Sequence, residues 1–472
     1  MDTSQIISVA IFVVAMIAIM TEKVHRALVA ITGAMLLLIL HIMPFETAIG
    51  HIDFNTLGVL FGMMLFVAVV KQSGVFEFLA IKCARVAKGN PWTIMVLFVL
   101  LTAVLSAFLD NVTTVLLIGP MTITVCRLLD IDPVPFFMTQ ILASNIGGTA
   151  TLIGDPPNIM IGSAAGYTFA DFIAYDAPAV IIILAAVIGL FYVMYGRKIS
   201  ANEEHRKTIM ELDENDYIKD RRLLHISVAM VVLVVVGFMT HGALGLESCV
   251  IALAAAGLIL LISGESIEEA LHGVEWTTLC FFAGLFIIVG AMSETGVIGM
   301  LAQGLIDVTG GNLMITMLAV LFGSAIISSF LDNIPFVATM IPIILTLEAD
   351  GLDGTALWWA LSLGACLGGN GTLIGASANV VLSDISKKFG HEITFMQFFK
   401  RGFPIMLFTV AIAAIYMVIR FPGGSLLPPA YRPAELPDAA GPCDTRPSPL
   451  AAWPKGLCRL ASGELQAPRG PR

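Results

Sequence analysis

The chain has 472 residues, of which 57% are hydrophobic and 13% are charged, whereas roughly a quarter of the residues in soluble domains are charged. This composition predicts a membrane protein and excludes a soluble enzyme and a nucleic-acid-binding protein. The 25 Lys and Arg against 35 Asp and Glu give a net charge of −10. In a membrane protein the meaning of that charge depends on the depth and side at which each residue lies.

Apolar runs that can cross a bilayer as helices recur along the chain. A span needs about 17 to 25 residues. Ten runs qualify, two of them interrupted: 5–20, 27–43, 55–70, 136–165 (interrupted), 177–195, 223–240, 246–263, 276–292, 356–386 (interrupted) and 403–419. Two further apolar stretches, 92–126 and 313–347, are each broken near the middle by an Asp-Asn pair. These two are predicted to be helical hairpins with a buried polar tip.

The second half of the chain repeats the first. At a shift of 222 residues the FLDN sequence of 108–111 falls on that of 330–333, and at a shift of 221 the glycine-rich 147–158 falls on 368–379. Chance similarity between hydrophobic runs would not reproduce polar and glycine positions in this order. An internal duplication of this kind is typical of secondary transporters.

The duplication predicts an all-α polytopic membrane protein with two inverted repeats, 1–198 and 223–420. Each repeat is expected to hold five transmembrane helices, one of them discontinuous, and a re-entrant helical hairpin, which makes ten spans in total. Because five is odd, the two copies are antiparallel in the membrane. The charged segment 199–222 is expected to be a cytoplasmic linker, and the Pro-rich tail 421–472 to be disordered.

Basic residues indicate the orientation. With the N-terminus outside, 18 of the 19 Lys and Arg residues before position 421 fall on the inner side, as the positive-inside rule expects. The N- and C-termini are therefore both predicted to lie outside, and the expected location is a bacterial inner membrane.

The hairpin tips carry acids where lipid would disfavour them. Asp110 and Asp332 lie midway along apolar stretches, where a charged side chain costs roughly 3 kcal/mol or more. We expect each tip to bind a cation or a proton, with Asn111 and Asn333 adding amide groups. Alternatively each acid caps the second arm of its hairpin, and both roles can hold together.

The two glycine-rich stretches are predicted to be breaks within spanning helices. Broken helices in transporters offer backbone carbonyls to cations. The polar side chains in the two breaks are candidate ligands: Thr149, Thr151, Asp155 and Asn158 in the first, and Asn370, Thr372, Ser377 and Asn379 in the second. The alternative is close helix packing through glycine, which does not explain the polar cluster.

The first repeat is the more acidic and polar of the two. Asp155 corresponds to Ala376, and Thr113-Thr114 corresponds to Pro335-Phe336. We therefore expect the tighter cation site, suited to Na⁺, in the first half, and Asn145 is a further candidate ligand. That Na⁺ site is predicted at Asp110, Asn111, Gly154, Asp155 and Asn158. Alternatively Asp155 caps the half-helix that begins at Pro156.

Basic side chains are expected to be missing from this core, because no Lys or Arg falls within a span or a hairpin tip. An anionic substrate would then be held by helix dipoles, amides, hydroxyls and bound cations. Motifs of intramembrane enzymes, such as GxSxG, HExxH or a P-loop, are not found in the sequence. No cofactor is expected beyond Na⁺ or H⁺ as a coupling ion.

Four motifs carry a family resemblance: FLDNVTT, NIGGTATLIGDPPN, FLDNIPF and GACLGGNGTLIGASANVV. With them, residues 1–420 closely resemble the P-protein (pink-eyed dilution) branch of the ArsB/NhaD permeases, in the ion transporter superfamily that includes citrate and dicarboxylate carriers. The resemblance implies two inverted repeats, a homodimer, and an elevator movement of hairpins and broken helices against a scaffold. It also implies Na⁺ and substrate sites at the hairpin tips and helix breaks. The Ser-Asn-Thr motifs of the divalent anion carriers are absent, which disfavours a dicarboxylate.

The function predicted from these observations is ion-coupled secondary transport of a small ion by alternating access, with Na⁺/H⁺ antiport as the first hypothesis. The alternative is a Na⁺- or H⁺-coupled carrier of an anion such as citrate, a dicarboxylate or arsenite. An ion channel is a more remote alternative. The expected partners are a small ion, the lipid bilayer and a second copy of the chain, with no nucleic acid.

Overall fold

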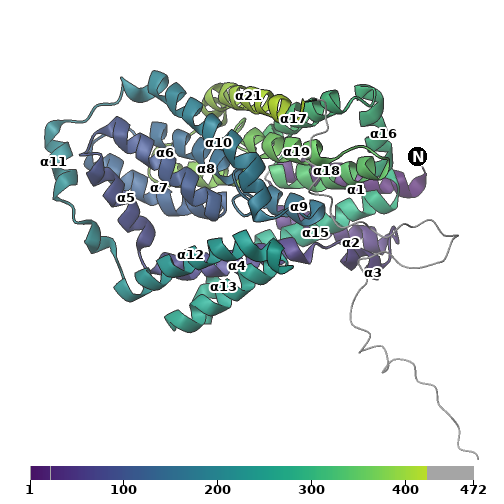
Figure 1. Ribbon diagram of the computed structural model, residues 1–472, viewed down its shortest axis with the longest axis horizontal. Helices are drawn as coiled ribbons and strands as arrows, with labels where there is room; N and C mark the ends of the chain where they lie inside the picture. Colours follow the sequence, from purple (N-terminus) through teal and green to yellow (C-terminus); the bar gives the residue numbers. More distant parts are fainter. Residues whose placement is uncertain (1, 22, 423–472) are drawn as a thin grey trace, which may run out of the picture. The chain divides into compact units, whose positions relative to one another are not determined.

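The computed structural model describes residues 2–21 and 23–422, and every regular element within them is a helix (Figure 1). The predicted disordered tail lies outside the described residues, apart from Phe421 and Pro422. The prediction of an all-helical membrane protein is confirmed.

The helices of the first half run from the N-terminus to the linker. In chain order they are α1 (Thr3–Met20), α2 (Arg26–Ile39), α3 (Phe45–Gly50), α4 (Phe54–Gln72), α5 (Val75–Val86), α6 (Pro91–Phe108), α7 (Asn111–Leu128), α8 (Val134–Gly148), α9 (Pro156–Ala165) and α10 (Phe169–Phe191), which continues into the π-helical turn η1 (Tyr192–Gly196). The linker contains α11 (Glu203–Glu211) and the 3₁₀ turn η2 (Glu214–Tyr217).

The second half follows with the same number of α-helices. They are α12 (Arg221–Leu244), α13 (Ser248–Ser263), α14 (Ile267–His272), α15 (Trp276–Glu294), α16 (Val297–Thr309), α17 (Leu313–Phe330), α18 (Asn333–Ala349), α19 (Thr355–Gly368), α20 (Ser377–Lys388) and α21 (Phe395–Arg420). Helices α4 and α15 both have 19 residues and begin 222 positions apart, as do the short helices α3 and α14. The same order of elements thus occurs twice, and the inversion of one half relative to the other across a membrane stays a prediction.

Helix lengths match most of the expected spans. Nine helices of the described chain are long and apolar enough to cross a membrane, and three of them, α6, α7 and α17, are arms of the two hairpins. Helices α2 and α13 are shorter, with 14 and 16 residues. The two interrupted spans are α8 with α9 and α19 with α20. The hairpin arms could cross by length alone, so their re-entrant path also stays a prediction.

Two helices extend beyond their predicted runs. Helices α10 and α21 begin eight residues before the apolar stretches expected at 177 and 403. Both start with a capping box, in which Thr168 and Thr394 bond to the third helical residue, and each capping box satisfies N–H groups that a helix start would leave unpaired. Charged residues near the helix starts, Asp171 and Asp176 in α10 and Lys400 and Arg401 in α21, kept these starts out of the predicted apolar runs.

The outer surface of the helical bundle is apolar. Large aliphatic side chains that are more than 60% exposed include Val14, Ile39, Ile181, Leu261 and Ile419, which lie on five different helices. A soluble protein rarely exposes so many aliphatic side chains, whereas lipid solvates them. The chain is a polytopic membrane protein.

The charged linker is docked rather than freely solvated. Ile209 is fully buried, the Lys219 ammonium lies 3.0 Å from the Glu77 carboxylate of α5, and Arg85 of α5 pairs with Glu214. The Lys219 N–H also donates to the Ser73 carbonyl. The linker therefore packs along α5, which the sequence had not indicated.

Two close helix crossings join the halves. Helix α2 packs on α15, and α4 packs on α13. A Cβ atom added to Gly62 of α4 would lie 2.7 Å from the Ala252 backbone, and one added to Gly284 of α15 would lie 2.6 Å from the Ala30 backbone. Ala30 and Ala252 are themselves 222 positions apart, so the same contact is built twice, and small residues allow both approaches.

Substituting Gly62→Ala or Gly284→Ala should lower the thermal stability of the purified protein in detergent. A methyl group must push two backbones apart at each crossing, and overpacking of this kind costs about 1 to 3 kcal/mol. Gly257→Ala is the matched control, because no atom lies within 4 Å of its added Cβ and alanine favours the helix. Equal melting temperatures for all three variants would contradict the close crossings.

Candidate functional site

Each hairpin turns at an acid that caps its second arm. The Asp110 carboxylate accepts hydrogen bonds from the Thr113 N–H at 2.8 Å and from the Thr113 hydroxyl at 2.5 Å, at the start of α7. The Asp332 carboxylate accepts one from the Ile334 N–H at 3.1 Å, at the start of α18. The capping interpretation is correct for both residues, and it leaves other carboxylate lone pairs for a ligand.

The helix breaks are held open by amide side chains. The Asn158 Nδ2 donates to the Thr151, Thr149 and Gly148 carbonyls at 3.0, 3.2 and 3.4 Å. The corresponding Asn379 Nδ2 donates to the Gly369 and Thr372 carbonyls at 2.7 and 2.9 Å. Each asparagine thus satisfies backbone groups that the interrupted helix leaves without intrahelical partners.

Threonine hydroxyls fasten the breaks to their surroundings. The Thr149 hydroxyl donates to the Asn145 carbonyl at 2.7 Å, while Thr151 and Thr372 donate to carbonyls at the ends of the first hairpin arms, those of Ala107 and Ser329. These hydroxyl protons are therefore committed to backbone. A ligand role for the three threonines would rest on their oxygen lone pairs alone.

Asp155 occupies the N-cap position of α9 but makes no capping hydrogen bond. Pro156 and Pro157 follow it and have no N–H to donate. Its two carboxylate oxygens instead lie 3.2 Å from the Nδ2 of Asn333, at the tip of the second hairpin. The side chain is buried, with Asp155 1% exposed. The capping interpretation of Asp155 is wrong, and its carboxylate faces the other half of the chain.

A second contact between the halves consists of asparagines. The Asn145 Nδ2 donates to the Asn370 Oδ1 at 3.0 Å and to the Asn379 Oδ1 at 2.9 Å, and the Asn111 Nδ2 donates to the Asn145 Oδ1 at 3.2 Å. All four are buried. Tips and breaks from both halves therefore meet at one place, as Figure 1 shows for α8, α9, α18 and α19 in the middle of the drawing.

A small cavity lies where these elements converge. It is lined by residues of the tips, the breaks, α2, α4 and the start of α15: Arg26, Leu60, Met64, Asp110, Asn111, Val112, Asp155, Pro156, Glu275, Thr278, Asn333, Ile334 and Ser377. The centre of a water-sized molecule can occupy about 20 Å³ of it, which is the room that about one water or a small ion needs. Five of the predicted ligands thus face one small polar space.

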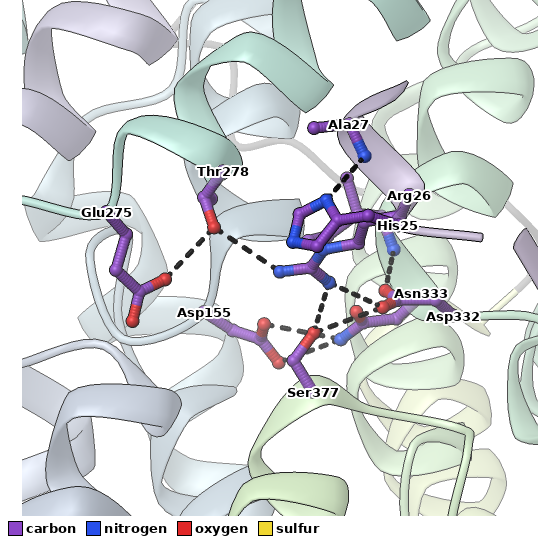
Figure 2. A network of polar contacts seen from close by, with 10 residues as sticks. His25, Arg26, Ala27, Asp155, Glu275, Thr278, Asp332, Asn333 and Ser377 are labelled. Atoms are coloured by element: carbon purple, nitrogen blue, oxygen red, sulfur yellow. Dashed lines mark hydrogen bonds and ion pairs between the residues drawn. The ribbon is translucent and has the colours of Figure 1, made fainter. Parts of the chain in front are cut away.

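Arg26 reaches this space, which corrects the expectation of a core without basic side chains. Its Nη1 donates to the Asp332 carboxylate at 3.1 Å and to the Ser377 hydroxyl at 2.5 Å, and its Nη2 donates to the Thr278 hydroxyl at 3.3 Å (Figure 2). Arg26 is the first residue of α2, so its position marks a span end, but its long side chain extends to the second hairpin tip.

A larger and more open cavity lies on the other side of Arg26. It has a volume of about 400 Å³, and its polar lining includes Asp332 and Asp384. Arg26 and Ser377 line both cavities. The ion pair of Arg26 with Asp332 and the Ser377 hydroxyl therefore lie between this wide cavity, the vestibule, and the small inner cavity.

Carboxylates outnumber basic groups in this region. Asp110, Asp155 and Glu275 line the inner cavity beside Arg26, whose own partner is Asp332. The Glu275 carboxylate accepts a hydrogen bond from the Thr278 hydroxyl at 3.0 Å. The region thus holds four acids and one guanidinium, which pairs with only one of them, and the arrangement is suited to a cation.

Three charged residues near the site escaped the sequence prediction. Arg26, Glu275 and Asp176 each directly precede an apolar run; from the sequence, Arg26 is counted only among the basic residues of the inner side, and Glu275 and Asp176 have no predicted role. In the sequence each of them is a charged residue next to a predicted span, and only the packing shows that its side chain points inward.

Among the predicted ligands, Thr114 is buried with no hydrogen-bond partner for its hydroxyl within the described residues.

Comparison with known proteins decides the family. The family model for citrate transporters matches residues 16–364. The chain belongs to the citrate transporter family. This transporter is 44% identical to an uncharacterized transporter of Mycobacterium bovis, over 88% of this chain and 98% of that one. It is 41% identical to a 46 kDa membrane protein of Mycobacterium leprae, over 88% and 99% of the two chains.

More distant relatives extend the comparison. The transporter is 34% identical to the P protein of Sus scrofa, over 85% of this chain but only 58% of that protein, so the resemblance to the P-protein branch is confirmed. Its fold resembles the crystal structure of the Alcanivorax borkumensis YdaH transporter, with a TM-score of 0.57, 14% identity, and coverage of 90% of this chain and 99% of that one.

The pair between Arg26 and Asp332 should be energetically coupled. Their side chains are 25% and 13% exposed, and a double-mutant cycle with Arg26→Met and Asp332→Asn should give a coupling energy of about 1 kcal/mol or more, measured by thermal unfolding in detergent.

The exposed pair between Lys387 and Glu392 is the matched control for this cycle. Its atoms are 3.1 Å apart, but its side chains are 65% and 60% exposed, and such pairs contribute about 0 to 1 kcal/mol. An equally small coupling energy for both pairs would show that the ion pair of Arg26 with Asp332 does not stabilise the site.

Proposed function

We propose that this transporter is an ion-coupled carrier that moves a small ion by alternating access, with the coupling cation, Na⁺ or H⁺, bound at Asp155. The observation that carries the proposal is the lack of a cation beside that carboxylate among the described residues: it is buried, its hydrogen bonds come from the amide of Asn333, and its other polar neighbour is the neutral Cys366 thiol.

A buried carboxylate needs more than one neutral donor. Removing an ionised acid from water is costly unless it is paired or neutralised, and the guanidinium in the cluster is engaged with Asp332. A proton or Na⁺ beside Asp155 would remove this cost. The inner cavity borders Asp110, Asn111 and Asp155, which supply the oxygen ligands that hard cations prefer.

The position of Asp155 could couple cation binding to movement of the hairpins and broken helices. Asp155 belongs to the first half and its donor Asn333 to the second, so loading or emptying the site changes a contact between the first helix break and the second hairpin tip. We propose that the hairpins and broken helices move together against the crossed pairs α2–α15 and α4–α13. The contact of Arg26 with Asp332 and Ser377 would hold the moving part in the conformation seen here.

Na⁺/H⁺ antiport is the first form of the proposal, because acids dominate the site. Coupled transport of an anion such as citrate is the second form, and a specific observation favours it: Arg26 stands between the inner cavity and the open vestibule, where its guanidinium could exchange Asp332 for a substrate carboxylate. The family description also names citrate.

Asp155→Asn should abolish Na⁺-driven proton movement in everted membrane vesicles, because the neutral amide has no negative charge to attract Na⁺ and does not take up a proton. The movement is measured as dequenching of a pH-sensitive dye. Asp307→Asn, an exposed acid of α16, is the control and should respond like the unaltered protein. Full activity of Asp155→Asn would contradict the assigned site.

Transport assays on the unaltered protein distinguish the two forms of the proposal. A Na⁺ response without uptake of labelled citrate supports antiport. Citrate uptake that depends on Arg26, with no dye response to Na⁺ alone, supports the anion carrier. A flux that does not saturate and shows no counterflow in proteoliposomes would instead indicate a channel.

We also propose that the transporter lies in a bacterial inner membrane as a homodimer, with both termini outside. The distribution of Lys and Arg supports the orientation, because 18 of the 19 before position 421 fall on the inner side, and in that orientation the vestibule beside Arg26 opens toward the cytoplasm. In a variant whose seven native cysteines are replaced, the added substitution Asp216→Cys at this exposed position of the linker should therefore react with an impermeant maleimide in everted vesicles but not in intact cells. Labelling in intact cells would contradict the proposed orientation and place the linker outside.

A further inference from the structure

A buried acid lies outside the site described so far. Asp176 of α10 is completely buried. Its Oδ2 is 2.5 Å from the hydroxyl oxygen of Ser362 in α19, and its Oδ1 has no hydrogen-bond partner within the described residues. A carboxylate so placed would carry a charge without the donors that a buried anion requires.

Counting protons around Ser362 shows how Asp176 avoids that charge. The Ser362 oxygen lies 2.8 Å from the Asn158 Oδ1 and 2.5 Å from the Asp176 Oδ2. The Asn158 amide is oriented by its three carbonyl partners, so its Oδ1 can only accept. Each of the two short contacts needs one proton, and a serine hydroxyl has one. The other proton must be on Asp176.

The neighbours of Asp176 supply no compensating cation. Ionisable groups that face it are the Cys366 thiol of α19 and the Tyr416 hydroxyl of α21, and the latter donates to the Tyr175 carbonyl at 2.6 Å. His241 of α12 lies at the other end, beside the Phe169 N–H at the start of α10, and Arg420 of α21 lies over the Tyr175 ring. Helix α8 has no ionisable residue. No described ion pair includes Asp176.

The fold itself does not require an acid at this position. Helices α10 and α21 correspond at a shift of 226, which aligns the capping residues Thr168 and Thr394 and the internal prolines of both helices. Asp176 then corresponds to Gly402, whose added Cβ would lie 2.6 Å from the Asn370 carbonyl oxygen. The same place beside a helix break thus holds a glycine in one half and a buried acid in the other.

We propose that Asp176 is a second proton-binding site, separate from Asp155, whose proton is held through Ser362 and released when the first helix break rearranges. In this conformation the Asp176 hydroxyl donates to Ser362, which donates to Asn158 in the break. When Asn158 moves away, the O–H bond of Asp176 breaks, its proton passes to water entering the break, and the Ser362 hydrogen turns to the resulting carboxylate. The release step rests on the transport function proposed above.

The bound proton can be tested without transport. The infrared difference spectrum of the purified protein minus its Asp176→Asn variant at neutral pH should contain the C=O stretching band of one protonated carboxyl, shifted by exchange into D₂O. The Asp307→Asn variant should give no such band. A difference spectrum with carboxylate bands in its place would overturn the proposal.

Asn should replace Asp176 without unfolding the chain, because its Nδ2 can donate to Ser362 as the protonated acid does. In proteoliposomes we expect Asp176→Asn and Ser362→Ala to retain ion flux but to lose part of the proton movement per transported ion and to flatten the pH dependence. If the two variants match the unaltered protein in both respects, Asp176 is not a coupling site. If the unaltered protein transports none of the ions tested, the proposed function fails, and the infrared band alone then decides whether Asp176 binds a proton.

Discussion

The structure depends on one constraint: a helix interrupted inside a membrane must satisfy its own backbone groups, because lipid offers no partner. Asn158 and Asn379 do this for the two breaks. The Ser106 and Ser328 hydroxyls of the hairpins add bonds to the Ser144 and Ala365 carbonyls, at 2.7 and 2.8 Å. The polar centre is in the first place a solution to this problem, and the charged site is built on it.

Equivalent backbone geometry in the two halves carries different chemistry. The first break presents Asp155 followed by two prolines, while the second presents Ala376 followed by Ser377. Arg26 has Ser248 at the position 222 residues later, so a basic side chain approaches one hairpin tip and not the other. The asymmetry is confined to a few side chains, and these rather than the helices would determine which ion is chosen and which half binds it.

Much of the fold could be predicted from the sequence, because breaks, hairpin tips and spans each combine an apolar run with a local polar or glycine signal. The gathering of Asp110, Asn111, Asp155, Asn333 and Ser377 at one cavity also follows from their motifs. The roles of Arg26 and Asp176 do not, since they depend on how far a side chain reaches and on which helices pack together. The sequence does not distinguish a charged residue that faces water at the end of an apolar run from one that faces the protein interior.

Limits of another kind arose where local chemistry overrides hydrophobicity. The capping boxes at Thr168 and Thr394 start helices ahead of charged residues that interrupt the apolar pattern. The linker was expected to be a solvated connector because it is rich in both acids and bases, yet its Ile209 is fully buried. In both cases a few specific contacts outweigh the average character of the segment.

The crossed pairs have a consequence for biosynthesis. Helices α2 and α4 find their main partners, α15 and α13, only in the second half of the chain. At about 5 to 20 residues per second, the ribosome takes on the order of ten seconds or more to deliver those partners. During that interval the small-residue faces around Ala30 and Gly62 lie open in the bilayer. Helices α2 and α4 are therefore inserted before they can dock on their partners, and a chain that stops at the linker would leave both faces available to other membrane helices.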